Sequence, residues 1–112
     1  LLLEVVSEYL MSQGHQVKQF SDPHKALEEI YKNSYDLVIT DRAMPGMTGD
    51  HLAKSIKEYM PEIPIIMLTG FGDIMKQTGE MPHNIDRLLS KPVSFRILKD
   101  AIGQTINEPK IV

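Results

Sequence analysis

The sequence contains no cysteine, and this absence narrows the classes of protein to which it can belong. Without cysteine there is no disulfide framework and no thiolate metal site, and the composition fits a reducing compartment. No apolar run approaches the roughly 18 residues that a membrane-spanning helix requires. A basic excess is missing as well, because 12 Lys and Arg are outnumbered by 15 Asp and Glu, which gives a net charge of −3. We therefore expect a cytoplasmic domain that binds neither nucleic acid nor a membrane.

Hydrophobic residues, by contrast, are numerous enough for one core. They make up 42% of 112 residues, a length that suits a single compact domain and is too short for two. Short apolar runs alternate along the chain with segments of helical periodicity. This alternation predicts an α/β fold with a parallel sheet.

Four segments have the apolar spacing that is typical of amphipathic helices. The first ends before Gly14, a residue common at helix C-terminal caps. The second follows Asp22-Pro23, which reads as an N-cap and a proline at the first helical position. The third ends at Pro61, and Ser94 caps the fourth. The inward faces of the second and fourth helices are expected to consist of Ala26, Leu27, Ile30, Tyr31, Phe95, Leu98, Ala101, Ile102 and Ile106.

Four short segments are strand candidates. Residues 37–41 and 63–68 contain apolar runs without alternation, which is typical of strands buried on both faces of a parallel sheet. Residues 16–20 and 87–90 are shorter candidates.

A polar residue stands at the carboxyl end of three of these strands. Asp41 ends the first buried strand, Thr69 follows the second, and Lys91 follows the last. Ligands of open α/β sheets bind at the carboxyl ends of the strands, so we expect the three side chains to line one crevice. Each residue alone is more often a cap or a solvated loop residue. Together, a carboxylate nucleophile, a hydroxyl and an ammonium are suited to phosphoryl transfer.

The residues after Asp41 form a motif of their own. Met44-Pro45, Met47 and Gly49 follow it at short spacing. This pattern resembles the signature of the receiver domains of bacterial two-component response regulators. In those domains a phosphorylated Asp precedes a Met-Pro loop and a Gly that opens the next helix.

Two further motifs carry the same resemblance. Thr69-Gly70 is similar to the switch Thr of the family with its small neighbour. Lys91-Pro92 is similar to the family's Lys, whose bond to the following Pro is usually cis. The likeness covers nearly the whole chain. It implies a flavodoxin-like, doubly wound, five-stranded parallel sheet in the order 2-1-3-4-5, an order for which a receiver serves as an example.

The resemblance also implies a role for each site residue. Asp41 would accept a phosphoryl group from a histidine kinase or phosphotransfer protein, and the domain would catalyse its own phosphotransfer and dephosphorylation. The carboxylate of Asp41 and the backbone carbonyl of Ala43 would bind Mg²⁺. Thr69 and Lys91 would hold phosphoryl oxygens. The structural positions of the motif are Pro45, Gly49 and Pro92.

Two departures from the family pattern are visible. The resemblance implies a first strand with an acidic Mg²⁺-binding pair upstream of Leu1, so residues 1–112 are expected to be a receiver domain that starts within its first helix. Leu88 stands where many receivers carry an aromatic residue that moves inward on phosphorylation. With a smaller side chain there, we expect phosphorylation to act mainly by ordering residues 70–84, with little change at Leu88.

Three functions stay open from the sequence. The first is a competent receiver, either on its own or fused to a kinase or output domain. The second is a degenerate pseudo-receiver that only binds partners, which the two departures favour and the presence of Asp41, Thr69 and Lys91 opposes. The third is a fragment of a haloacid-dehalogenase-type phosphatase. That family has a second Asp two residues after the first, where this sequence has Ala43.

Overall fold

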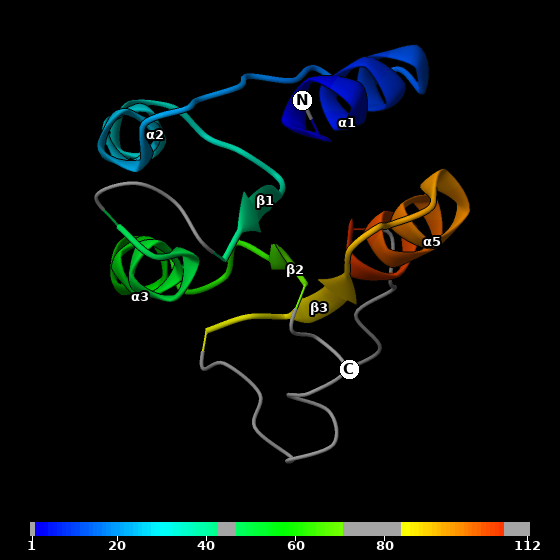
Figure 1. The fold of residues 1–112 in the computed structure, drawn as a ribbon. Helices are drawn as coiled ribbons and strands as arrows, with labels where there is room; N and C mark the ends of the chain where they lie inside the picture. Colours follow the sequence, from blue (N-terminus) through cyan, green and yellow to red (C-terminus); the bar gives the residue numbers. More distant parts are fainter. Residues whose placement is uncertain (1, 43–46, 71–83, 107–112) are drawn as a thin grey trace, which may run out of the picture.

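The computed structural model describes residues 2–42, 47–70 and 84–106, and within them three parallel strands form a sheet with helices on both faces (Figure 1). Among these residues no helix is long and apolar enough to cross a membrane. The predicted α/β class is confirmed. The elements are α1 (Leu2–Ser12), α2 (Pro23–Lys32), β1 (Val38–Asp41), α3 (Gly49–Tyr59), β2 (Ile65–Thr69), β3 (Arg87–Ser90) and α5 (Phe95–Ile106).

The strand order places β2 in the centre, with β1 on one side and β3 on the other. Both pairs are parallel, and Asp41 lies opposite Leu68. The ladder continues one residue beyond the strands on both sides of β2. The backbone N–H of Arg42 donates to the carbonyl of Leu68 at 3.1 Å, and that of Lys91 donates to the carbonyl of Thr69 at 2.9 Å. The carboxyl ends of all three strands therefore meet at one edge of the sheet.

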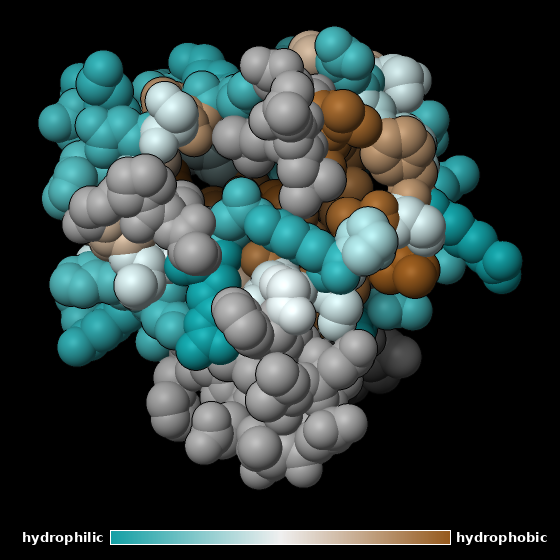
Figure 2. All heavy atoms as spheres, viewed as in Figure 1, coloured by the Kyte–Doolittle hydropathy of each residue, from teal (hydrophilic) through white to brown (hydrophobic). Residues whose placement is uncertain are grey.

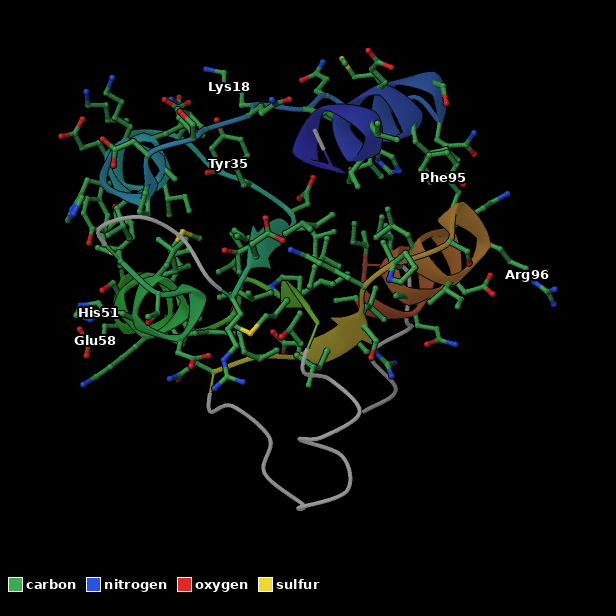
Figure 3. All side chains as sticks on the ribbon, in the orientation of Figure 1. Lys18, Tyr35, His51, Glu58, Phe95 and Arg96 are labelled. Atoms are coloured by element: carbon green, nitrogen blue, oxygen red, sulfur yellow. The ribbon has the colours of Figure 1, made fainter. Side chains whose placement is uncertain are left out.

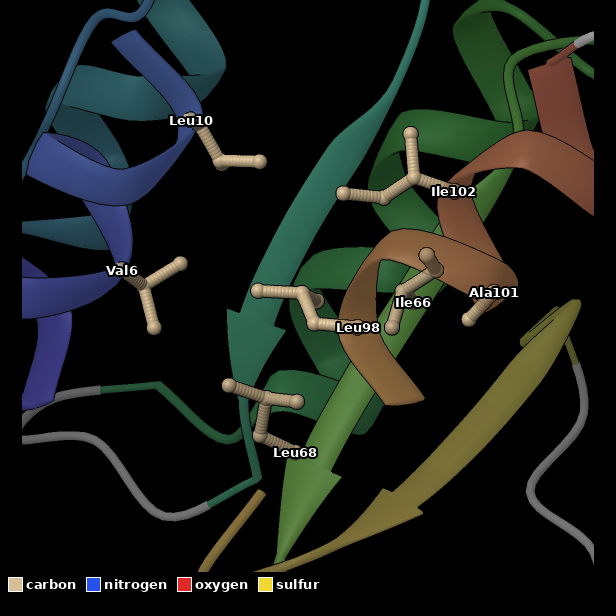
Figure 4. Close-up of a cluster of buried hydrophobic side chains, with 7 residues drawn as sticks. All are labelled: Val6, Leu10, Ile66, Leu68, Leu98, Ala101 and Ile102. Carbon is tan, nitrogen blue, oxygen red and sulfur yellow. The ribbon is translucent and has the colours of Figure 1, made fainter. Parts of the chain in front are cut away.

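The side chains of β2 point alternately to the two faces of the sheet, as the two-residue period of a strand requires. Ile66 and Leu68 pack with α1 and α5 on one face (Figure 4), whereas Ile65 packs with α2 and α3 on the other. All five residues of β2 are buried. The unbroken apolar run of β2 thus corresponds to a strand that is covered on both faces. The fully buried side chains with the largest volumes are Ile56, Ile65, Ile66, Met67 and Leu98.

The helix ends form where the local sequence predicts them. Gly14 has φ +89°, and the N–H groups of Gly14 and His15 donate to the carbonyls of Met11 and Leu10, a C-cap that glycine accommodates without strain. Asp22 caps α2 by accepting from the backbone N–H of His24 at 2.9 Å.

The last helix is capped in the same way. The hydroxyl of Ser94 accepts the backbone N–H of Ile97 at 3.1 Å. In α3 the capping residue is Thr48, whose hydroxyl accepts from the backbone N–H of His51. These contacts satisfy donors that the first turn of a helix leaves unpaired.

Residues 16–20 do not form the predicted strand. A parallel strand needs a neighbouring strand to complete its hydrogen bonds, and the described residues contain none beside this segment. The three described strands match the last three of the expected order 2-1-3-4-5.

Three side chains expected in the core are exposed instead, namely Tyr31, Phe95 and Ile106. Two of them make aromatic pairs at the surface. Tyr31 contacts Tyr59 edge-on with ring centroids 4.7 Å apart, and Phe95 stacks on Tyr9 at 4.3 Å. These pairs join α2 to α3 and α1 to α5 at the borders of the helices' apolar faces.

The two sides of the molecule differ in surface character. In the view of Figure 2, hydrophobic side chains gather between α1 and α5, and hydrophilic side chains cover the side of α2 and α3. Exposed apolar side chains on α1 and α5 include Val5, Met11, Phe95 and Ile97.

A carboxylate on α2 ties together the chain segments on either side of that helix. Oε1 of Glu29 accepts from the hydroxyl of Tyr35 at 2.6 Å, from Nζ of Lys18 at 2.9 Å and from Nδ2 of Asn33 at 2.9 Å. Lys18 precedes α2 and Tyr35 follows it (Figure 3). The hydrogen bond from Tyr35 and then that from Lys18 lower the pKa of Glu29 to about 2. Burial and the hydrogen bond to Glu29 raise the pKa of Tyr35 to about 12.

This cluster predicts how stability depends on pH. Unfolding returns Glu29 to its ordinary pKa of 4.5, so its contribution is fully present above pH 4.5 and is lost as the pH falls toward 2. The contribution of Tyr35 is present below its ordinary pKa of 10 and is lost as the pH rises toward 12. Glu29→Gln should flatten the acid limb of the free energy of unfolding against pH. Denaturant titrations from pH 2 to pH 7 test this, and an unchanged acid limb would contradict it.

Candidate functional site

Asp41 and Lys91 are in direct contact at the carboxyl edge of the sheet. Nζ of Lys91 lies 2.8 Å from Oδ1 of Asp41, and their side chains are 36% and 28% exposed. That oxygen is buried, and the ammonium of Lys91 lies against it. Asp41 is the last residue of β1, and Lys91 directly follows β3. Because β2 is the central strand, its whole width lies between them. The long lysine side chain is what allows the ammonium to span it.

Thr69 lies between them, at the end of the central strand. It is 2% exposed, and its carbonyl accepts the backbone N–H of Lys91 at 2.9 Å. This hydrogen bond fixes the residue that carries the ammonium against the end of β2. The Lys91–Pro92 peptide bond is cis. The three polar residues singled out from the sequence therefore occupy the ends of three adjacent strands.

Leu88 is already buried in this structure. It is 6% exposed and packs with Met67, its partner in the register of β2 and β3. Most of the segment expected to become ordered on phosphorylation, residues 71–83, lies outside the described residues. So do Ala43 and Pro45 of the predicted motif.

Gly49 touches the backbone of Asp41. A Cβ atom built on Gly49 would overlap the carbonyl oxygen of Asp41 and would stand 3.0 Å from the Cα of Arg42 and from the Cε of Met67. The N–H of Gly49 donates to the carbonyl of Arg42 at 2.7 Å. A glycine is needed here because the first residue of α3 packs directly on the end of β1.

An ion pair beside the site was not predicted from the sequence. Nη2 of Arg42 lies 3.4 Å from Oδ2 of Asp50, in the first turn of α3. The two residues are eight positions apart, and no helical or strand spacing relates them. To predict this pair from the sequence, one would have to know how closely α3 packs on β1.

The described residues do not by themselves form a complete site for Mg²⁺. A hard cation takes about six oxygen ligands, of which carboxylates are the strongest. In residues 2–42, 47–70 and 84–106, no group of three His, Cys, Asp or Glu side chains is placed to hold a metal ion. Among the described residues, Asp41 supplies the carboxylate that contacts Lys91.

Comparison with known proteins places this arrangement in a family. Residues 1–103 match the response regulator receiver domain. The chain is 29% identical over 103 residues to the response regulator protein FleR of Pseudomonas aeruginosa, covering 92% of the chain and 22% of that protein. It is 30% identical over 99 residues to the sensor histidine kinase RcsC of Salmonella typhimurium, covering 88% of the chain and 10% of that protein.

A solved structure agrees with these matches. The response regulator protein TrrA of Thermotoga maritima, in complex with Mg²⁺ and BeF, superposes with a TM-score of 0.81 at 26% identity. The match covers 93% of this chain and 89% of that one. The fold and the family match define a phosphoacceptor module of two-component signalling. The chain belongs to the response regulator receiver domain family.

Proposed function

We propose that Asp41 accepts a phosphoryl group from a histidine kinase or phosphotransfer protein, and that this modification switches the interactions of the domain. The observation that carries the proposal is the 2.8 Å contact between Asp41 and Lys91 at the edge where three parallel strands end. The side chain of Asp41 is 28% exposed, which leaves it accessible to a phosphoryl donor, and its cation holds it in place.

The chemistry follows from these groups. A carboxylate oxygen of Asp41 attacks phosphorus, the bond from phosphorus to the donor nitrogen breaks, and an acyl phosphate forms. The negative charge on the phosphoryl oxygens is then stabilised by the ammonium of Lys91. In this proposal the hydroxyl of Thr69, which ends the intervening strand, donates to the same group. Preorganised donors of this kind do the main work in phosphoryl transfer, because little other chemistry is required of the protein.

The partners of the whole protein belong to the same proposal. The chain spans about a fifth of FleR and a tenth of RcsC. A regulator and a sensor kinase thus both carry a matching segment, which supports a receiver fused to a kinase or to an output domain. We propose that residues 1–112 belong to one such receiver, with a preceding strand and an acidic pair that complete its Mg²⁺ site.

Retention of beryllofluoride tests the proposal. The full-length protein should retain this phosphoryl analogue when Mg²⁺ is present and release it when Mg²⁺ is chelated. The 112-residue chain alone should show no retention and no tight Mg²⁺ binding by calorimetry, because its described residues offer too few oxygen ligands.

The controls separate the alternatives. Asp41→Asn should abolish retention in the full-length protein, since the analogue bonds to the carboxylate. A full-length protein that retains no analogue at any Mg²⁺ concentration would favour the pseudo-receiver. Tight Mg²⁺ binding by the 112-residue chain would refute the need for further carboxylates.

A further inference from the structure

Two contacts join the residue after Asp41 to the beginning of α3. The carbonyl of Arg42 accepts the N–H of Gly49 at 2.7 Å, and the guanidinium of Arg42 lies 3.4 Å from the carboxylate of Asp50. Arg42 is also anchored to the sheet, because its own N–H donates to Leu68. Arg42 therefore connects the end of the sheet to the first turn of α3 through both its backbone and its side chain.

The position of this turn is transmitted directly to Asp41. Gly49 packs so closely on the carbonyl of Asp41 that not even a methyl group fits between them. Protein interiors at this density transmit small shifts rather than absorb them. A displacement of the first turn of α3 would therefore move the backbone that carries the Asp41 carboxylate, and with it the contact to Lys91.

The carboxylate of Asp50 is stabilised by its place in the first turn of α3 and by a neighbouring cation. A carboxylate is favoured at the N-terminus of a helix by the helix dipole. One of its oxygens, Oδ1, is buried and accepts no hydrogen bond from the described residues. The other oxygen contacts Arg42, which is the cation that the described residues place beside it.

The pair contributes little to global stability. Its side chains are 34% and 41% exposed, and ion pairs of that exposure typically contribute less than about 1 kcal/mol. Arg42 directly follows β1, and its guanidinium contacts Asp50 on α3. We expect an effect of Arg42 on the reaction to pass through these backbone contacts and α3.

We propose that Arg42 and Asp50 form a positioning pair that holds the first turn of α3 against Asp41 and so sets the reactivity of its carboxylate. This inference rests on the proposed function of Asp41. In this role the pair needs no contact with the phosphoryl group or its donor. It acts by keeping the nucleophile aligned, and a misplacement of about 1 Å in such a group can cost up to 100-fold in rate.

A double-mutant cycle in the full-length protein tests the inference. The initial rate of labelling by radiolabelled acetyl phosphate is measured for wild type, Arg42→Gln, Asp50→Asn and the double variant, together with the melting temperature of each. Each single variant should label roughly 3- to 10-fold more slowly, and the double variant should be no slower than the singles, because both remove the same contact. Arg42→Lys, which keeps the charge, should recover most of the rate.

Lys18→Gln serves as the matched control, since it breaks another surface ion pair, between Lys18 and Glu29, away from the site. It should label at the wild-type rate even if its melting temperature falls as far as that of Arg42→Gln. Wild-type rates in both single variants, or losses that add in the double variant, would overturn the positioning role. Failure of the proposed function is distinguishable, because Asp41→Asn would then label as well as wild type.

Discussion

Gly49→Ala should destabilise the domain by about 3 kcal/mol, the upper end of the cost of overpacking a close contact. The added methyl group would overlap the carbonyl oxygen of Asp41, which is backbone and cannot rotate away. Either α3 or the end of β1 must move. In a domain of about 100 residues, a loss of this size lowers the melting temperature by roughly 12–24 °C.

Gly103→Ala is the matched control for this substitution. Gly103 lies within α5, and a Cβ atom there would meet nothing within 4 Å. Alanine is favoured over glycine inside a helix by about 0.5–1 kcal/mol, so this variant should be more stable than wild type. Thermal and urea unfolding of the two variants measure the difference. A Gly49→Ala protein as stable as wild type would show that α3 does not pack on Asp41 as described.

Lys91→Ala should reduce the phosphorylation-dependent response by about 10- to 100-fold while changing stability little. A hydrogen bond to a charged group typically contributes about 1.5–3 kcal/mol, which corresponds to that range of affinity. The pair with Asp41 is partly exposed, so its contribution to the free energy of unfolding should stay below about 1 kcal/mol. The loss of the response should therefore be large where the loss of stability is small.

Binding of the partner kinase or output domain, with and without beryllofluoride, measures the response to Lys91→Ala. Lys54→Ala removes the same charge from an exposed position on α3 and should leave the response unchanged. If Lys91→Ala lowers the melting temperature and the response in the same proportion, Lys91 is a structural residue rather than part of the site.

Local signals in the sequence predicted most of the secondary structure. The bounds of β3, residues 87–90, are as predicted, and the caps at Gly14, Asp22 and Ser94 form because each depends on only a few neighbouring residues. The prediction of a strand over residues 16–20 was wrong, because a strand does not depend on neighbouring residues alone. A strand depends on a partner elsewhere, and periodicity does not reveal whether one is present.

The meeting of three strand ends at one edge was predictable, because a topological rule brings strand ends together whatever the details of packing. Asp41, Thr69 and Lys91 follow from that rule. The rule does not predict the 2.9 Å contact between Lys57 and Asp86, because these residues are 29 positions apart and do not lie at strand ends of that edge. Asp86 also accepts the backbone N–H of Ile65 at 2.7 Å, and so links α3 to the beginnings of β2 and β3.

The exposed aromatic side chains show a further limit of sequence patterns. Tyr31 and Phe95 lie at the borders of apolar helix faces, where a turn of a few tens of degrees decides between core and surface. Their pairing with Tyr59 and Tyr9 depends on which helices are neighbours. Spacing within one helix carries no information on that point.

The central claim, that Asp41 is the phosphoacceptor, is tested most directly by locating the label. The full-length protein is incubated with radiolabelled acetyl phosphate and Mg²⁺, alongside Asp41→Asn and Asp36→Asn. Asp36 is an exposed carboxylate just before β1, at the opposite edge of the sheet, and serves as the control. We expect wild type and Asp36→Asn to take up label that hydroxylamine releases, as it does from an acyl phosphate, and Asp41→Asn to take up none. Equal labelling of Asp41→Asn and wild type would contradict the assignment.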